Sequence, residues 1–265
     1  MRSNARRLTT PALLVLALLL ATGTASAAPP YVERPITLPR LDFAGDVGIG
    51  VGHIGFRNVD RTGPGMNLEA ALGITDRVEL GLRTGIRFGD DGRAVQADSY
   101  GRTLWTETWG VNGSTVANPE FKLRWAAYSG RVVEVGLDGR VFMPVENGSH
   151  FGMMFGVPLA FHIGGWVRID TGAYIPVVFS DPVFRGLSVP GYFWFQLSDR
   201  LWLGPMAAIR TLDPPSDTSL LLGFGLGYQV ANAVDLKTML LFPRIANTEG
   251  ARVVGAGFGV QFRIE

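Results

Sequence analysis

VELGLRTGIRF, residues 78–88, alternates between two kinds of side chain along its length. Its apolar residues share one face with a period of two, and glutamate, arginine and glycine share the other. Successive side chains of a β-strand point to opposite sides of the sheet, so this pattern indicates a strand whose two faces meet different surroundings. A helix would lose up to about 1 kcal/mol for each glycine relative to alanine. The stretch therefore predicts a strand.

The same alternation continues from Leu41 almost to the end of the chain, and VEVGLDGRV (133–141) and VRID (167–170) repeat it clearly. Tight turns are centred near residues 76, 130, 165, 199 and 232. Longer polar connections lie near 55–64, 89–118, 144–150, 180–186, 212–217 and 243–250. Together these turns and connections predict twelve strands, at about 41–54, 65–74, 78–88, 119–127, 133–143, 151–163, 167–179, 187–197, 201–211, 218–230, 234–242 and 251–264.

An even number of strands, with short turns at one end and long loops at the other, is typical of an outer-membrane barrel. We therefore expect an all-β fold: a transmembrane, antiparallel, up-and-down β-barrel with short periplasmic turns and longer extracellular loops. Both chain ends then lie on the periplasmic side, and the 89–118 loop faces the cell exterior.

The apolar face predicts contact with lipid, because aromatic residues on it gather at both strand ends as interfacial belts require. At the long-loop end these are Phe88, Phe121, Phe151, Phe179 and Phe242, and at the short-turn end Trp125, Phe161, Phe195, Tyr228 and Phe262. A soluble sandwich or a lipocalin, the alternative, would bury this face and need not sort its aromatics by strand end.

The first 27 residues have the three parts of a signal peptide: arginines near the start, a short apolar core, and Ala25-Ser26-Ala27 as a cleavage pattern. The expected organisation is a signal peptide (1–27), a periplasmic and exposed proline-rich lead-in (28–40) and the barrel (41–265). The expected location is the outer membrane of a Gram-negative-type bacterium, after cleavage near Ala27. Loss of three arginines changes the net charge from +1 to −2, which gives no basic excess for nucleic acid.

The face opposite the apolar one carries nine acids and nine bases. They are Asp42, Asp46, Glu69, Glu79, Glu120, Glu134, Asp138, Asp170 and Asp235, with Arg83, Arg87, Lys122, Arg124, Arg140, Arg168, Arg210, Lys237 and Arg263. The candidates for lining the lumen are Glu69, Glu79, Arg83, Arg87, Lys122, Arg124, Glu134, Asp138, Arg140, Arg168, Asp170, Arg210, Asp235 and Lys237. An unpaired charge in a narrow lumen is costly, so a structural lattice of ion pairs is favoured over a substrate-selective filter.

Twelve strands place the barrel between packed eight-stranded interiors and open sixteen-stranded channels. Inward glycines at positions 48, 50, 81, 85, 223, 225 and 227 are expected to leave space along the wall. The lumen is then either a narrow pore or a barrel plugged by the long loop. Within it, we expect Arg83, Arg87, Lys122 and Arg124 to form a basic ridge facing Glu134 and Asp138.

We expect no catalytic residues, cofactor or metal site. His150 beside Ser149 could belong to a barrel-borne hydrolase, but no nucleophile motif surrounds the pair. His162 falls on the lumen face, where a hydrogen-bonded wall residue is the favoured interpretation. There is no cysteine, which excludes thiolate metal sites and a lipoprotein anchor.

Residues 68–82 (LEAALGITDRVELGL) resemble the G-[IL]-[TS]-D-R-x-E-L hairpin of outer-membrane transporters grouped with the phenol-degradation outer-membrane family. Residues 118–124 (NPEFKLR) resemble the strand that follows the long loop in those proteins. The chain departs from the common assembly signal, which ends in phenylalanine, because its last residues are Phe262-Arg263-Ile264-Glu265. The resemblance implies uptake or efflux of small solutes, apolar or aromatic ones among them.

The expected function is therefore a passive channel or transporter for small solutes. The alternatives are a structural or surface-binding barrel and, less favoured, a hydrolase. Expected partners are outer-membrane lipid, and the barrel-assembly machinery and periplasmic chaperones during biogenesis.

Overall fold

The computed structural model describes residues 29–56, 59–87, 116–145, 150–179, 181–213, 217–242, 245 and 253–264. Its elements are the 3-10 helix η1 (Tyr31–Glu33) and the strands β1 (Phe43–Phe56), β2 (Val59–Thr75), β3 (Val78–Arg87), β4 (Val116–Ser129), β5 (Val133–Phe142), β6 (Gly152–Ile163), β7 (Val167–Val178), β8 (Phe184–Gln196), β9 (Leu201–Asp213), β10 (Asp217–Ala231), β11 (Val234–Phe242) and β12 (Val253–Ile264). No helix in this part of the chain is long and apolar enough to cross a membrane.

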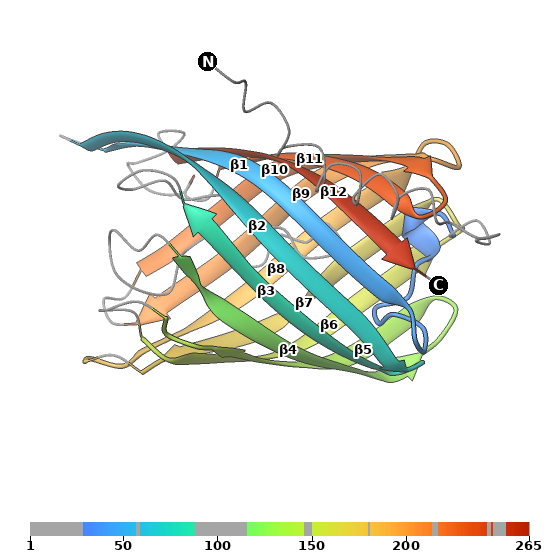
Figure 1. Cartoon of the computed structure of the whole chain (residues 1–265), viewed down its shortest axis with the longest axis horizontal. Coiled ribbons are helices and arrows are strands. Elements are labelled where there is room, and N and C mark those ends of the chain that lie inside the picture. Colours follow the sequence, from blue (N-terminus) through green and yellow to red (C-terminus); the bar gives the residue numbers. More distant parts are fainter. Residues whose placement is uncertain are drawn as a thin grey trace, which may run out of the picture.

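The twelve strands form one closed barrel in which every strand pairs antiparallel with its neighbours in sequence (Figure 1). β1 closes the barrel against β12, from Phe43 opposite Ile264 to Ile54 opposite Val253. The predicted fold class, strand number and five tight turns are confirmed. Closure leaves no sheet edge with unpaired backbone groups, which is the condition for spanning a membrane with strands.

The expected loop at 55–64 is wrong for most of its length. β1 and β2 continue to pair down to Phe56 opposite Val59, and this hairpin extends beyond the neighbouring strands at the end opposite η1 (Figure 1). The Nδ1 atom of His53 lies 2.9 Å from Oγ1 of Thr62 across the two strands. The polar composition of this stretch suggested a loop, but strand pairing needs only the backbone groups, which polar side chains do not block.

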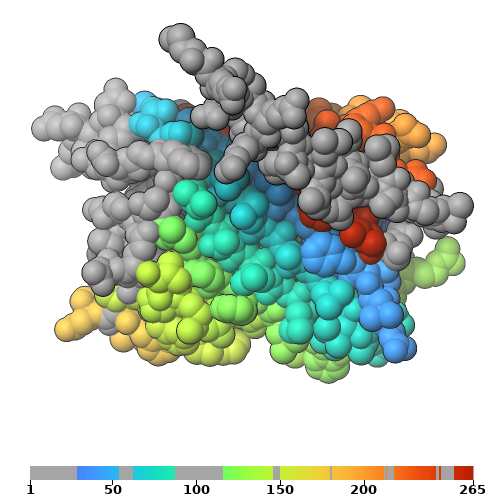
Figure 2. All heavy atoms as spheres, viewed as in Figure 1, coloured from blue at the N-terminus to red at the C-terminus, as the bar shows by residue number. Residues whose placement is uncertain are grey.

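The two faces of each strand differ in burial as predicted. On β4, Lys122 and Arg124 are buried, while Phe121, Leu123 and Trp125 between and beside them are about half exposed, with exposed fractions of 52%, 51% and 46%. Similar large apolar side chains are exposed on nearly every strand. The outer wall over β1 to β4 faces the viewer in Figure 2. A continuous apolar surface of this kind is far larger than the patches on soluble monomers, and it fits lipid.

The proline-rich segment before β1 corrects the expectation of an exposed lead-in at 28–40. We call its described part, residues 29–42, the plug, because it enters the barrel at the short-turn end, where η1 lies (Figure 1). Its buried side chains are Tyr31, Val32, Arg34, Ile36, Thr37 and Leu38, each less than 9% exposed. Prolines prevent the segment from joining the sheet, and the apolar residues between them are covered by the inner wall instead.

Candidate functional site

Side chains of the barrel wall hold the backbone of the plug. The carboxylates of Glu134 and Glu79 accept hydrogen bonds from the amides of Ile36 and Leu38, at 2.8 and 3.0 Å. Arg124 donates from Nη1 to the carbonyl of Ile36 at 3.2 Å. Buried backbone groups need such partners, and here charged wall residues supply what a neighbouring strand would otherwise supply.

Three more wall residues extend this arrangement toward η1. His162 lies with Nδ1 at 2.6 Å from the carbonyl of Val32, which requires the proton on Nδ1 because a carbonyl can only accept. The side-chain oxygen of Gln196 accepts from the amide of Val32 at 3.3 Å, and Arg168 donates to the carbonyl of Arg34. The favoured interpretation of His162, a hydrogen-bonded wall residue, therefore agrees with its geometry.

The plug also contributes a charge of its own to the lumen. Arg34 binds Asp235 on β11 through both terminal nitrogens, at 2.6 and 3.2 Å, and its Nε donates to the carbonyl of Pro29. Asp235 also accepts from Arg263 on β12 at 3.0 Å. The Asp235 carboxylate is fully buried, so this two-pronged contact replaces the water that it has lost.

Tyr31 is enclosed by aromatic and cationic side chains of the wall. Its ring stacks on Trp202, with centroids 4.8 Å apart and an interplanar angle of 3°, and meets Trp194 edge-on at 5.6 Å. The guanidinium carbons of Arg34 and Arg168 lie over the ring at 5.3 and 5.7 Å. Each aromatic pair is worth about 0.5–1.5 kcal/mol beyond the burial of its area, so Tyr31 anchors the plug.

On the other side of the lumen, β2 to β5 carry a lattice of ion pairs. Arg124 and Asp138 are opposite each other on β4 and β5, with Nη2 and Oδ2 2.7 Å apart. Arg140 joins Asp138 to Glu120, at 2.7 Å to each, and Arg83 also pairs with Glu120. Acids and bases alternate through the lattice, so every charge here has an opposite neighbour.

Further ion pairs surround the lattice. Lys122 reaches both Glu69 and Glu79, at 3.2 and 3.1 Å. Elsewhere on the wall Arg168 binds Asp170 at 2.9 Å, and Lys237 pairs with Asp46.

Thirteen of the fourteen lumen candidates are buried inside the barrel: Glu69, Glu79, Arg83, Lys122, Arg124, Glu134, Asp138, Arg140, Arg168, Asp170, Arg210, Asp235 and Lys237. The side chain of the remaining candidate, Arg87, lies outside the described part. The expected basic ridge is only partly right: Arg124 binds Asp138 as expected, but Arg83 and Lys122 bind other acids. Arg83 and Arg124 each bind an acid directly opposite, and Glu134 binds the plug and His162 rather than the bases. The alternation of residues indicated the inner face for these groups and Asp138 as an acid facing the bases, but it did not identify the partners of Arg83, Lys122 and Glu134.

Most inward glycines do not leave space, contrary to the expectation. A Cβ on Gly225 or Gly227 would come within 2.7 or 2.2 Å of the Trp194 or Trp202 ring, and one on Gly81 within 2.6 Å of Lys122. Gly48 differs from these three, because the nearest neighbour of a Cβ there would be 3.8 Å away. It borders a cavity of about 30 Å³ lined by Asp46, Gly48, Ile49, Asn67, Lys237, Met239, Gly257, Phe258 and Gly259.

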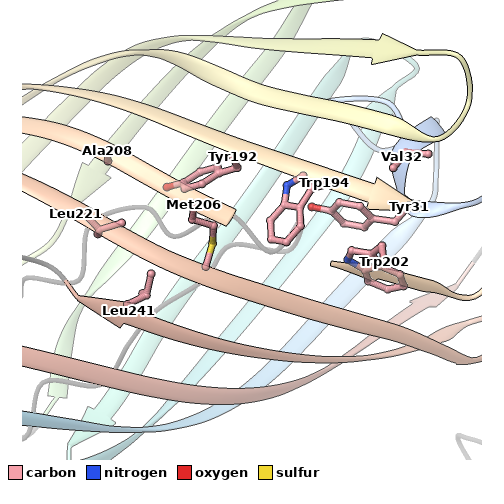
Figure 3. Close-up of a cluster of buried hydrophobic side chains, with 9 residues drawn as sticks. All are labelled: Tyr31, Val32, Tyr192, Trp194, Trp202, Met206, Ala208, Leu221 and Leu241. Atoms are coloured by element: carbon pink, nitrogen blue, oxygen red, sulfur yellow. The ribbon is translucent and has the colours of Figure 1, made fainter. Parts of the chain in front are cut away.

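A row of apolar side chains lies on the inner face of β8 to β11, where polar residues were expected. The row contains Tyr192, Trp194, Trp202, Met206, Ala208, Leu221 and Leu241, all buried in one cluster with Tyr31 and Val32 (Figure 3). We call the wall part of this cluster the apolar track. Residues 192–195 (YFWF) are four consecutive aromatic residues, so aromatic side chains lie on both faces of this strand. This departure from the apolar–polar alternation was the signal in the sequence for an apolar inner wall.

The hydrolase alternative rested on His150 and Ser149. The carbonyl of His150 accepts from Asn118, and His53 faces Thr62, while Ser149 lies outside the described part. No group of three or more potential metal ligands occurs among the residues that the structure describes.

Known structures match the fold closely but the sequence weakly. The NanC porin aligns with a TM-score of 0.57 at 9% identity, covering 82% of this chain and 100% of the porin. An outer membrane channel from Pseudomonas putida F1 aligns with a TM-score of 0.57 at 11% identity, covering 87% and 99%. The KdgM porin, solved in complex with disordered oligogalacturonate, gives 0.54 at 9% identity, covering 84% and 99%. No family model matches the chain, and no curated protein matches it in sequence. The chain thus shares the fold of these outer-membrane barrels.

Proposed function

We propose that this protein is a passive outer-membrane channel or transporter for small solutes, in which the plug closes the lumen at its periplasmic end. The observation that carries the proposal is that part of the lumen is filled by a segment outside the barrel wall. Part of the interior is occupied by residues 31–38 of the plug, which belong to no strand and are held against the wall by side-chain contacts. A purely structural barrel can fill its core from its wall, as eight-stranded barrels do. A plug that is not part of the wall can move out of the lumen, and its departure widens the lumen.

The apolar track supports a finer proposal about the solute. Charged side chains cover the lumen over β2 to β5, whereas β8 to β11 present Trp194, Trp202, Met206 and Leu221. Such a surface favours small apolar or aromatic solutes, because moving them from water onto it releases about 25 cal/mol for each Å² buried. The resemblance of residues 68–82 to the phenol-degradation outer-membrane family agrees with this substrate class.

The proposal includes export by the signal peptide with cleavage near Ala27, folding by the barrel-assembly machinery with periplasmic chaperones, and no catalytic step. The location follows from the exposed apolar wall, which needs a bilayer. The competing candidate is a structural or surface-binding barrel. The ion-pair lattice is the one observation that favours it, because paired charges would stabilise the wall of a permanently closed barrel as well as that of a channel.

Flux through proteoliposomes separates the two functions. Purified, refolded protein is reconstituted, and the entry of a phenolic solute and of a small sugar is followed without any energy source. The proposal expects flux above that of protein-free vesicles, and more for the phenolic solute after its passive leak is subtracted. Flux equal to that of protein-free vesicles for both solutes would support a structural barrel and overturn the channel.

A further inference from the structure

The pocket that holds Tyr31 has the form of a ligand site whose ligand is part of the same chain. Trp202 supplies a face, Trp194 supplies an edge contact, and Arg168 places a cation over the ring. We call these three wall residues the aromatic slot (Figure 3). The ring of Tyr31 within it is a phenol, and the residue is 1% exposed.

The slot belongs to paired strands of the wall, whereas its occupant, Tyr31, belongs to the plug. Trp194, Trp202 and Arg168 lie on β8, β9 and β7, strands that each pair with a neighbouring strand on both sides. Tyr31 lies in the plug, which pairs with no strand in η1 and is tied down by side-chain contacts. Withdrawal of the plug therefore removes Tyr31 and leaves the slot in place.

The slot also lies at the end of a route for an apolar molecule. The apolar track leads from Leu221 and Leu241 past Met206 to Trp194 and Trp202 (Figure 3). Glycines at 225 and 227 let the two indole rings come close to the wall, because a Cβ at either position would lie within 2.7 or 2.2 Å of a ring. A solute that moves along this track meets the ring of Tyr31 before it can leave the barrel at the short-turn end.

We infer that the aromatic slot is a binding site for a single planar aromatic ring of about the size of a phenol, and that Tyr31 is its built-in competitor. A solute ring that takes the slot excludes Tyr31, and the plug loses its anchor and opens. This inference rests on the proposed channel function and adds to it the solute class and the event that opens the lumen. By linkage, a ligand that binds only the plug-free state shifts the population toward that state.

Thiol labelling of the plug measures this event directly, because the chain has no cysteine. Thr37→Cys places a single thiol on a buried residue of the plug, and a water-soluble maleimide modifies it only when the plug is out. A solute present at about ten times its dissociation constant for the slot should raise the labelling rate about tenfold. p-Cresol is the probe, and 4-methylcyclohexanol, of similar size but without a planar ring, is its control.

Two further substitutions in the Thr37→Cys background identify the site. With Tyr31→Ala, the competitor is gone, so labelling should be fast and p-cresol should no longer accelerate it. With Trp202→Leu, the face of the slot is gone, so p-cresol should lose its effect whatever the basal rate. Tyr128→Ala is the matched control, since Tyr128 lies exposed near the β4–β5 turn, and it should preserve the p-cresol response.

The inference is overturned if p-cresol leaves the labelling rate of the Thr37→Cys protein unchanged. It is also overturned if 4-methylcyclohexanol accelerates labelling as strongly, or if the p-cresol response survives Trp202→Leu. Titration calorimetry gives an independent check, since Tyr31→Ala should bind p-cresol at least about tenfold more tightly than the unaltered protein does. These readouts need no transport. Normal labelling results with absent solute flux would refute the channel and leave the slot standing, and the reverse result would refute the slot alone.

Discussion

The carbonyl oxygen of Pro39 occupies the position where a side chain on Gly73 would begin. A Cβ built on Gly73 would lie 1.8 Å from that oxygen. The two segments are also joined by backbone hydrogen bonds, from the amide of Leu41 to the carbonyl of Gly73 at 2.7 Å and from the amide of Gly73 to the carbonyl of Asp42 at 2.9 Å. Glycine at this inward position of β2 is therefore what allows the plug to turn into β1.

Gly73→Val should displace the plug and leave the barrel folded. The added side chain cannot coexist with the backbone of Pro39, and overpacking of this kind costs about 1–3 kcal/mol. Hydrogen exchange at the amides of Ile36 and Leu38, which wall carboxylates protect, should become faster. Gly139→Val is the control, since a Cβ there meets nothing within 4 Å. Unchanged exchange in Gly73→Val would refute the described seating of the plug.

Arg124→Leu should destabilise the barrel by about 3 kcal/mol, because it leaves a buried carboxylate short of a partner. Asp138 would lose its contacts at 2.7 and 3.0 Å, and the carbonyl of Ile36 would lose its donor. Arg185→Leu is the matched control. Arg185 pairs with Asp213 at 3.5 Å, but both side chains are more than half exposed, so its loss should cost no more than about 1 kcal/mol. Urea unfolding in lipid vesicles gives both values, and equal losses would show that the lattice is hydrated.

Leu82→Arg and Leu222→Arg should each lower the free energy of unfolding in lipid by about 2–4 kcal/mol near the bilayer midplane. Both leucines are exposed on the outer wall, at 45% and 40%. The conservative change Leu82→Met should be nearly neutral in the same vesicles. A small penalty for both arginines would place this wall in water rather than lipid.

The strands were readable from sequence because lipid and lumen impose opposite demands on alternate residues over nearly the whole chain. The tight turns followed for the same reason, since only an odd-length connection keeps Leu80 and its apolar neighbours on one face. The limit of that reading was the 59–64 stretch, whose polar residues and Pro64 suggested a loop although the stretch pairs with β1.

The interior was less predictable, because its contacts join residues far apart in the chain. Glu134 accepts from Ile36, which is 98 residues away, and Arg34 reaches Asp235, which is 201 residues away. A proline-rich segment has no periodicity from which such partners could be inferred. The apolar track was missed for a different reason: Tyr192 and Trp194 are apolar on a face that was expected to be polar.

Single-channel conductance in planar bilayers tests the central claim most directly, that residues 29–42 close a lumen which is otherwise open. The mature protein is compared with a variant that lacks residues 29–40 and starts just before β1. The account predicts rare or small openings for the mature protein and steady, clearly larger openings for the variant. Equal conductance of the two, or continued silence of a folded variant without the plug, would contradict it.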